Sequence, residues 1–300
     1  MNTDNNFLDT FTNLIDSQEI DPSNKKTKLS LFVHNVNANS FDYDLLKERL
    51  LEPLIDFSLS GKTSAKLQGM PATLSKRARE RFVQKMNTGE LGELLLFCFL
   101  KTHLKAPKIL SKLELKTSNK FYVNGSDGIH FLKLDDGNYQ IIFGESKTIK
   151  NLSDAIREAL QSIHDFKNEV NSKGEEKSGI NYEKTLISAH LENESFTDDE
   201  KLIIEDLIYP KESNKFNVDN AFGIFIGYEI SITEEDKNLS NEEFRNVINE
   251  RIKKEIEGQF DNISKKISDL GLNGHCFYIY ILPFTDLDQV REDITKSITA

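Results

Sequence analysis

The stretch that decides the fold of this chain is GSDGIHFLKLDDGNYQIIFGESK, residues 125–147. Short apolar runs on both sides of its centre predict two strands, 127–134 and 139–147. Asp135-Asp136-Gly137 joins them, and three residues of this kind fit a hairpin loop in which a type I turn is followed by a left-handed glycine. The sequence therefore predicts an antiparallel hairpin at the centre of the chain.

The turn type decides which residues face each other across this hairpin. A three-residue loop pairs Leu134 with Asn138, and counting outward then places Asp127 opposite Glu145. Lys147 shares the face of Glu145, because alternate residues of a strand point the same way. A two-residue loop would shift the pairing by one residue and separate the two carboxylates.

The predicted register brings two acidic side chains together on one face. The Cβ atoms of Asp127 and Glu145 would lie ~5 Å apart, and charges that close repel unless a proton or a cation lies between them. A hard divalent cation would relieve this repulsion, and Mg²⁺ suits a site with few protein ligands. The structural alternatives are an Asx turn at Asp127 and an exposed ion pair between Glu145 and Lys147.

A helix is expected before this hairpin, where Thr88 can act as the N-cap and the helix runs to about His103. It is apolar nearly all round after Glu93, which predicts burial. Glu90 and Glu93 lie on one face of its first turn and would reach Asp127 if the helix packs over that side of the hairpin. Acidic residues in a first turn also serve simply as helix caps. The apolar residues on the strand face that this helix is expected to cover are Ile129, Phe131, Ile141 and Phe143.

The rest of the chain predicts an α/β fold with a mixed sheet flanked by helices. Further strands are expected at residues 29–36, 109–117, 221–230 and 275–282. Helices are expected at residues 40–57, 74–86, 153–170, 198–208, 241–268 and 287–297, with a connection at 60–72. The expected organisation is an N-terminal part with a basic helix, a core and a C-terminal extension of the same domain, at residues 1–85, 86–190 and 191–300.

Charge is unevenly distributed along the chain. The formal net charge of −11 argues against a nucleic-acid binder held by overall charge. Residues 61–120 nevertheless contain 13 Lys and Arg against four Asp and Glu. This segment is a candidate for contacts with the phosphates of DNA, and a solvated lysine-rich surface is the alternative. The candidate phosphate-contacting residues are Lys76, Arg77, Arg79 and Arg81.

Composition also predicts the compartment and excludes some activities. No apolar run reaches the ~18–20 residues of a membrane span, and the polar N-terminus does not resemble a signal peptide. Cys98 and Cys276 lie far apart in the sequence and indicate no disulfide framework, which favours a cytoplasmic protein without a membrane partner. The chain contains no Walker A motif, so any ATP hydrolysis would belong to a partner.

The order of these motifs resembles the PD-(D/E)xK nuclease superfamily, in which a helix with Glu precedes a strand with Asp and a strand with Glu-x-Lys. Asp127 matches the Asp of that pattern, and Glu145 and Lys147 match its Glu-x-Lys. Ser126 stands where the superfamily pattern has proline, a departure that many members share. The resemblance implies a restriction-endonuclease-like sheet and the hydrolysis of phosphodiester bonds.

Residues outside the hairpin extend this resemblance. Glu93 matches the glutamate of the superfamily's helix by its distance from Gly89, and Glu90 is the second choice. Gln161 on the following helix corresponds to a supporting polar residue. His130 is expected to point away from Asp127, as a packed or supporting histidine rather than a metal ligand.

A narrower resemblance rests on three segments, GELGE at 89–93, GSDGIH at 125–130 and GESK at 144–147. Together they resemble the nuclease subunit of the Hachiman anti-phage defence system, the HamA-like family. The resemblance implies a DNA nuclease that acts with a HamB-like helicase subunit. Phosphate contacts from the basic segment predict little sequence preference, and because such a nuclease would endanger its own cell, we expect the helicase to restrain it. The resemblance also implies Mg²⁺ or Mn²⁺ as the cofactor, with Lys147 orienting water or neutralising charge. The metal ligands that it implies are Asp127, Glu145, the carbonyl of Ser146, and Glu93.

Two other interpretations of the sequence stay open. The chain could be a catalytically silent subunit that keeps the nuclease fold to dock a helicase, or a plain α/β binding module whose motifs are turns and caps. The presence of Asp127, Glu145 and Lys147 together favours the enzyme.

Overall fold

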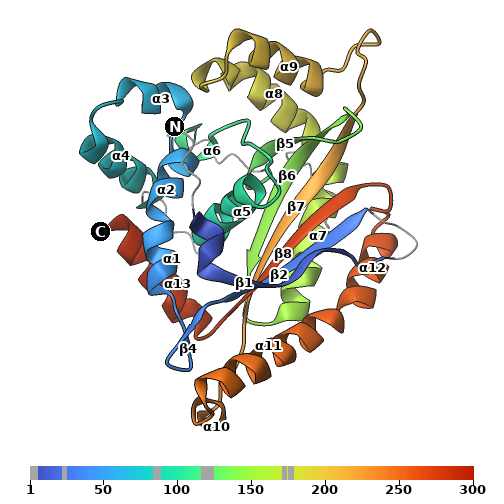
Figure 1. The fold of residues 1–300 in the computed structure, drawn as a ribbon. Helices are drawn as coiled ribbons and strands as arrows, with labels where there is room; N and C mark the ends of the chain where they lie inside the picture. Colours follow the sequence, from blue (N-terminus) through green and yellow to red (C-terminus); the bar gives the residue numbers. More distant parts are fainter. Residues whose placement is uncertain (1–5, 22–25, 84–88, 116–124, 171–173, 175–178) are drawn as a thin grey trace.

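A six-stranded mixed sheet forms the centre of the computed structural model, which describes residues 6–21, 26–83, 89–115, 125–170, 174 and 179–300 (Figure 1). Its strands stand in the order β1-β2-β8-β7-β6-β5. The four inner strands are parallel, and each edge strand is antiparallel to its neighbour, which confirms the predicted mixed α/β fold. The strands are β1 (Phe11–Glu19), β2 (Thr27–His34), β5 (Ile129–Lys133), β6 (Tyr139–Thr148), β7 (Val218–Glu229) and β8 (Cys276–Phe284), and the short pair β3 (Val36–Asn37) and β4 (Ser40–Phe41) lies apart.

The hairpin of β5 and β6 has the predicted loop and register. Leu134 N–H donates to the carbonyl of Asn138 over 2.8 Å, and Ile129 pairs with Phe143 at the far end of the ladder. Gly137 has a φ of +84°, a conformation that glycine adopts without the steric cost of a Cβ. The three-residue loop therefore forms as its sequence indicates.

Helices cover both faces of the sheet (Figure 1). One face carries α5, with further helices packed around it, and these share one apolar core with that face of the sheet. The helices of this side are η1 (Asn6–Thr10), α1 (Asp44–Arg49), α2 (Leu51–Ser58), α4 (Pro71–Val83), α5 (Glu90–Thr102), α6 (Lys112–Leu115) and α13 (Leu287–Thr299).

The opposite face carries the crossover helices that connect the parallel strands, and these share a second apolar core with the other face of the sheet. The helices of this core are α7 (Leu152–Asn168), α8 (Ile180–His190), α9 (Asp198–Ile208), α11 (Asn241–Glu257) and α12 (Phe260–Asp269). The remaining short helices are α3 (Gly61–Lys66), η2 (Leu191–Asn193) and α10 (Glu234–Lys237).

Helix α5 is buried on nearly all sides, as its composition predicts, because it lies between the sheet and α2. Glycine on the strand beneath it allows this close packing, since a Cβ at Gly144 would lie 2.9 Å from Leu96 Cδ2 and 3.2 Å from the backbone nitrogen of Gly128. The predicted packing of α5 over the face of Phe143 is wrong. Phe143 contacts Phe166 of α7, with ring centroids 5.3 Å apart, on the other side of the sheet. Both faces of β6 are apolar, so the sequence pattern alone did not show which face α5 covers.

Three further expectations differ from the structure. The strand expected at 109–117 is wrong over the described residues 109–115, because Lys108 pairs with His130 in an isolated bridge and α6 follows. Its apolar residues suit both the strand and the helix period, which makes such short runs ambiguous. Residues 116 and 117 lie outside the described residues. The connection expected at 60–72 contains α3, and the helix expected at 40–57 is divided into α1 and α2 after β4.

The other expected helices and strands are confirmed within a few residues, with 241–268 divided into α11 and α12. Thr88, the expected N-cap of the buried helix, lies outside the described residues, as does Met86, the expected end of the basic helix at 74–86. Strands of all three expected parts of the chain join the same sheet. None of the described helices combines the length and the apolar character that crossing a lipid bilayer requires.

Candidate active site

The β5–β6 ladder ends in a bulge at Asp127. Asp127 N–H donates to the carbonyl of Gly144 over 2.7 Å, and Gly144 N–H donates to the carbonyl of Gly128 over 2.8 Å. Two residues of one strand therefore lie opposite one residue of the other, the pattern of a β-bulge. A bulge changes the direction of the side chain at its first residue, so Asp127 does not continue the alternation of β5.

The Asp127 carboxylate lies against the backbone of Ser146. Its Oδ2 accepts one hydrogen bond from Ser146 N–H at 2.6 Å and a second from Ser146 Oγ at 2.9 Å. Because a strand residue directs its N–H and its C=O to the same edge, the carbonyl of Ser146 also points to the side of Asp127. The side chain of Ser146 faces α5, since a Cβ at Gly92 would lie 3.3 Å from its Oγ.

Glu145 and Lys147 point to the other side of β6, toward α7. Lys147 Nζ donates to Glu145 Oε1 over 2.5 Å, and their side chains are only 26% and 13% exposed, respectively. Ser162 of α7 also hydrogen-bonds Glu145. The predicted pairing of Glu145 with Lys147 on one face is confirmed.

Electrostatic coupling joins the two carboxylates. Burial, and next the negative charge of Asp127, raise the pKa of Glu145 to about 7, and Lys147 offsets only part of this rise. Burial alone would lower the pKa of Lys147, but the charge and hydrogen bond of Glu145, with the charge of Asp127, raise it above its ordinary value. The expectation that Asp127 and Glu145 share one sheet face is wrong, because the bulge redirects Asp127, but the two charges still interact.

Glu93 and Asp127 line one small cavity under α5, together with His130 and Lys112. Its volume is about 20 Å³, which is enough for one water molecule. Of the described residues that line it, Glu93 is the glutamate, whereas Glu90 is 5% exposed in the first turn of α5. The geometry thus brings Glu93 to the side of Asp127.

His130 and Gln161 are the two expected supporting residues, and His130 is a packed histidine, as expected. His130 is buried, and its Nδ1 lies 2.8 Å from the carbonyl of Ala106. Burial lowers its pKa to about 4. The prediction that His130 points away from Asp127 is wrong, since both line the same cavity. Gln161 donates to Asp165 within α7 over 2.7 Å, and Ser162 is the α7 residue at Glu145.

Ser162 is a site residue that the sequence analysis missed, and Glu158 is another. The negative charge of Glu158 helps to raise the pKa of Lys147. The two residues are four positions apart on α7, so they share one helix face. The available signal was this spacing in the helix expected at 153–170.

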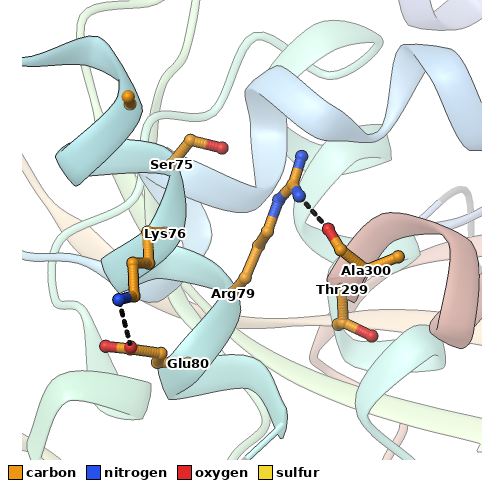
Figure 2. A pocket seen from close by; sticks show the side chains of 7 residues that line it. Ser75, Lys76, Arg79, Glu80, Thr299 and Ala300 are labelled. Carbon is orange, nitrogen blue, oxygen red and sulfur yellow. Dashed lines mark hydrogen bonds and ion pairs between the residues drawn. The ribbon is translucent and has the colours of Figure 1, made fainter.

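The candidate phosphate-contacting residues lie on α4, whose Ala78 and Phe82 are buried. Figure 2 shows Lys76 beside Glu80, at 3.9 Å, and the Arg79 guanidinium donating to the carbonyl of Ala300. These residues line an open groove of about 820 Å³ between α4 and α13. Lys76 and Arg79 therefore make local contacts, whereas Arg77 is exposed and Arg81 half-buried.

The donor set fits a sparse divalent-cation site but not a dense one. Among the residues that the structure describes, no three His, Cys, Asp or Glu side chains gather closely enough to hold a metal ion. Asp127 and Glu145 do carry coupled negative charge, and one or two carboxylates suffice for Mg²⁺ when water and phosphate oxygens complete its shell. These donor types suit such an ion, with Asp127 on the α5 side of β6 and Glu145 on the α7 side.

Comparison with known protein families gives a match over nearly the whole chain. A family model described as HamA matches residues 6–298 of the chain. The matched range contains every strand from β1 to β8 and all residues of the candidate site. A comparison with curated proteins gives no match.

Proposed function

Because the chain belongs to the HamA family, a component of the Hachiman anti-phage defence system, we propose that it is a metal-dependent DNA nuclease. The observation that carries the proposal is the coupling of Asp127 to Glu145 beside Lys147. These residue types in this order resemble the PD-(D/E)xK pattern, and the mixed sheet is compatible with a restriction-endonuclease-like fold. The proposed nuclease core at 86–190 contributes β5 and β6 to the sheet, and the parts before and after it contribute β1, β2, β7 and β8.

Asp127, Glu145 and the carbonyl of Ser146 would hold Mg²⁺ or Mn²⁺, with Glu93 reaching it through water. When bound, such an ion polarises the scissile phosphate and lowers the pKa of a water ligand. The bulge serves this site because it fixes Asp127 at the edge to which the Ser146 carbonyl points. The hydrogen bonds from Ser146 hold one carboxylate oxygen of Asp127 and orient the other.

Lys147 would stabilise charge on the phosphate. Its pKa is raised by Glu145 and Asp127, so its ammonium group stays protonated at neutral pH. A fixed cation placed where charge develops in the transition state is among the largest catalytic contributions. Lys147 would also orient the attacking water, since Glu145 holds its Nζ in place.

The basic residues of α4 would hold the DNA backbone. Contacts of Lys and Arg with phosphates carry no sequence information, so little sequence preference is expected. Such a nuclease endangers the DNA of its own cell, and the Hachiman context supports restraint by a partner. We propose that this partner is a helicase subunit. It would hold the nuclease site away from intact DNA and release it when a processed end or a damaged strand appears.

The test is a cleavage assay on purified protein with plasmid and linear DNA, with and without the helicase subunit. Cleavage should require Mg²⁺ or Mn²⁺ and vanish in EDTA. Lys147→Met should abolish it, whereas the control Lys150→Met should not, because Lys150 pairs with Glu229 and Asp288 outside the site. Undiminished cleavage by Lys147→Met would overturn the mechanism. No cleavage by wild type under any of these conditions would favour the catalytically silent subunit.

A further inference from the structure

A buried ion pair lies directly behind the loop that carries Asp127. Lys112 of α6 donates to Glu183 Oε1 of α8 over 2.5 Å, and the two residues are 71 positions apart in the sequence. Their side chains are 5% and 0% exposed. The pair is therefore withdrawn from solvent, unlike the surface ion pairs of this protein.

This pair holds Ser126, the residue before Asp127, from both sides of its backbone. Glu183 Oε1 accepts from Ser126 N–H at 2.9 Å and lies 3.3 Å from Ser126 Oγ. Lys112 Nζ donates to the carbonyl of Ser126. The fit leaves no room for another side chain at Gly125, because a Cβ there would lie 2.0 Å from Glu183 Oε1.

Stability alone does not account for such a pair. Burying two charges costs as much free energy as their attraction returns, and apolar replacements are often neutral or stabilising. The second carboxylate oxygen of Glu183 has no hydrogen-bond partner among the described residues, which adds a further cost. Polar groups kept at such a cost are expected where a functional site needs fixed geometry.

We propose that Glu183 and Lys112 are positioning residues that fix the carboxylate of Asp127 through Ser126. The inference rests on the proposed nuclease function, in which Asp127 holds the metal ion. The chain of contacts runs from Glu183 to Ser126, then through one peptide unit to Asp127, and from its Oδ2 to the N–H of Ser146. A displacement of Glu183 should therefore weaken the hydrogen bond from Ser146 N–H on β6 to Asp127.

Two double variants separate this role from simple packing. Lys112→Met/Glu183→Gln removes both charges but keeps an acceptor for Ser126 N–H, and Lys112→Met/Glu183→Leu removes both charges and the acceptor. Both should fold, because neither leaves an unpaired buried charge. Asp236→Asn is the matched control, since Asp236 pairs with Arg251 far from this loop.

The main readout is amide hydrogen exchange at Ser146, measured without metal or DNA. The Leu variant should exchange about tenfold faster or more at Ser146, while the Gln variant and the control stay near wild type. The Leu variant should also lose the rise in melting temperature that Mn²⁺ gives wild type. Equal Ser146 exchange in the Leu and Gln variants, both folded, would overturn the positioning role.

The exchange measurement does not depend on catalysis. If the Leu variant alone exchanges faster but wild type never cleaves DNA, the positioning role stands and the proposed nuclease function fails. If wild type cleaves DNA and the two variants cleave and exchange alike, the nuclease function stands and the positioning role fails.

Discussion

The backbone N–H of Ser146 donates to the carboxylate of Asp127 over 2.6 Å, at the point where the ladder between β5 and β6 ends. A side-chain oxygen thus occupies the place that a strand carbonyl would take in a continued ladder. Asp127 therefore has a structural role as well as a proposed chemical one. Replacing it with Ala or with Asn should separate these two roles.

Asp127→Ala should lose about 1–3 kcal/mol of unfolding free energy, because Ser146 N–H and Oγ lose their acceptor. Asp127→Asn should lose less, since its amide oxygen can still accept. Both should abolish cleavage. Denaturant unfolding of the two variants checks this, and an equal loss for Asn and Ala would contradict the hydrogen-bond argument.

Glu145→Gln should keep or slightly raise the metal-free melting temperature at pH 8. The raised pKa shows that the folded state disfavours the charged carboxylate, through burial and then through Asp127. Wild type should gain stability on addition of Mg²⁺ by mass action, and Glu145→Gln should not. Thermal melts with and without Mg²⁺ measure both effects. A clear loss of metal-free stability would instead identify an ordinary ion pair with Lys147.

Glu93→Gln should reduce cleavage by about tenfold or more, because Glu93 lines the cavity beside Asp127. Glu90→Gln should affect melting temperature more than cleavage, because Glu90 is buried in the first turn of α5. Parallel cleavage assays and melts of the two variants decide between them. If Glu90→Gln reduced cleavage more than Glu93→Gln, Glu90 would instead be the glutamate of the active site.

Arg77→Glu/Arg81→Glu should weaken DNA binding. The plot of log K against log salt should become shallower, with its negative slope reduced in magnitude by about 2, or about 1 for each lost phosphate contact. Arg77 and Arg81 are chosen because Lys76 and Arg79 contact Glu80 and Ala300. Binding is measured by fluorescence anisotropy between about 50 and 200 mM salt, a range over which the affinity of a phosphate-binding protein changes strongly. Lys253→Glu/Lys254→Glu on α11 is the matched control of equal charge. An unchanged slope would identify α4 as an ordinary solvated surface.

His34 should make the fold sensitive to acid. Burial lowers its pKa to about 3, and both ring nitrogens lack hydrogen-bond partners among the described residues. The unfolded chain takes up a proton near pH 6.5 and the folded protein does not, so stability is full above that pH and falls as pH drops toward 3. His34→Phe should remove on the order of 3 kcal/mol of this loss. Unfolding between pH 8 and about 4 measures the difference, and identical slopes for wild type and variant would refute it.

Local pattern alone determined the elements around the site. The short apolar runs on both sides of Asp135-Asp136-Gly137 predicted the hairpin and its loop, because a turn of three residues and the strands beside it depend on neighbours in the sequence. The apolar composition of α5 predicted its burial for the same reason. The pairing of Glu145 with Lys147 followed from the two-residue period of a strand.

Tertiary structure alone decided how these elements meet. Both faces of β6 are apolar, so only the packed molecule shows that α5 lies over Gly144 and α7 over Phe143. The bulge at Asp127 arises from hydrogen bonds to Gly144, and alternation carries no mark of it.

The ion pair behind Asp127 was equally beyond the reach of sequence pattern. Lys112 lies in a short apolar run that suits both a strand and a helix, and Glu183 is one acidic residue on a polar helix. Their meeting depends on where α6 and α8 are held by the two cores of the molecule. The sequence by itself thus determined which residue types stand at the end of the hairpin, and packing between distant segments determined where their charges lie.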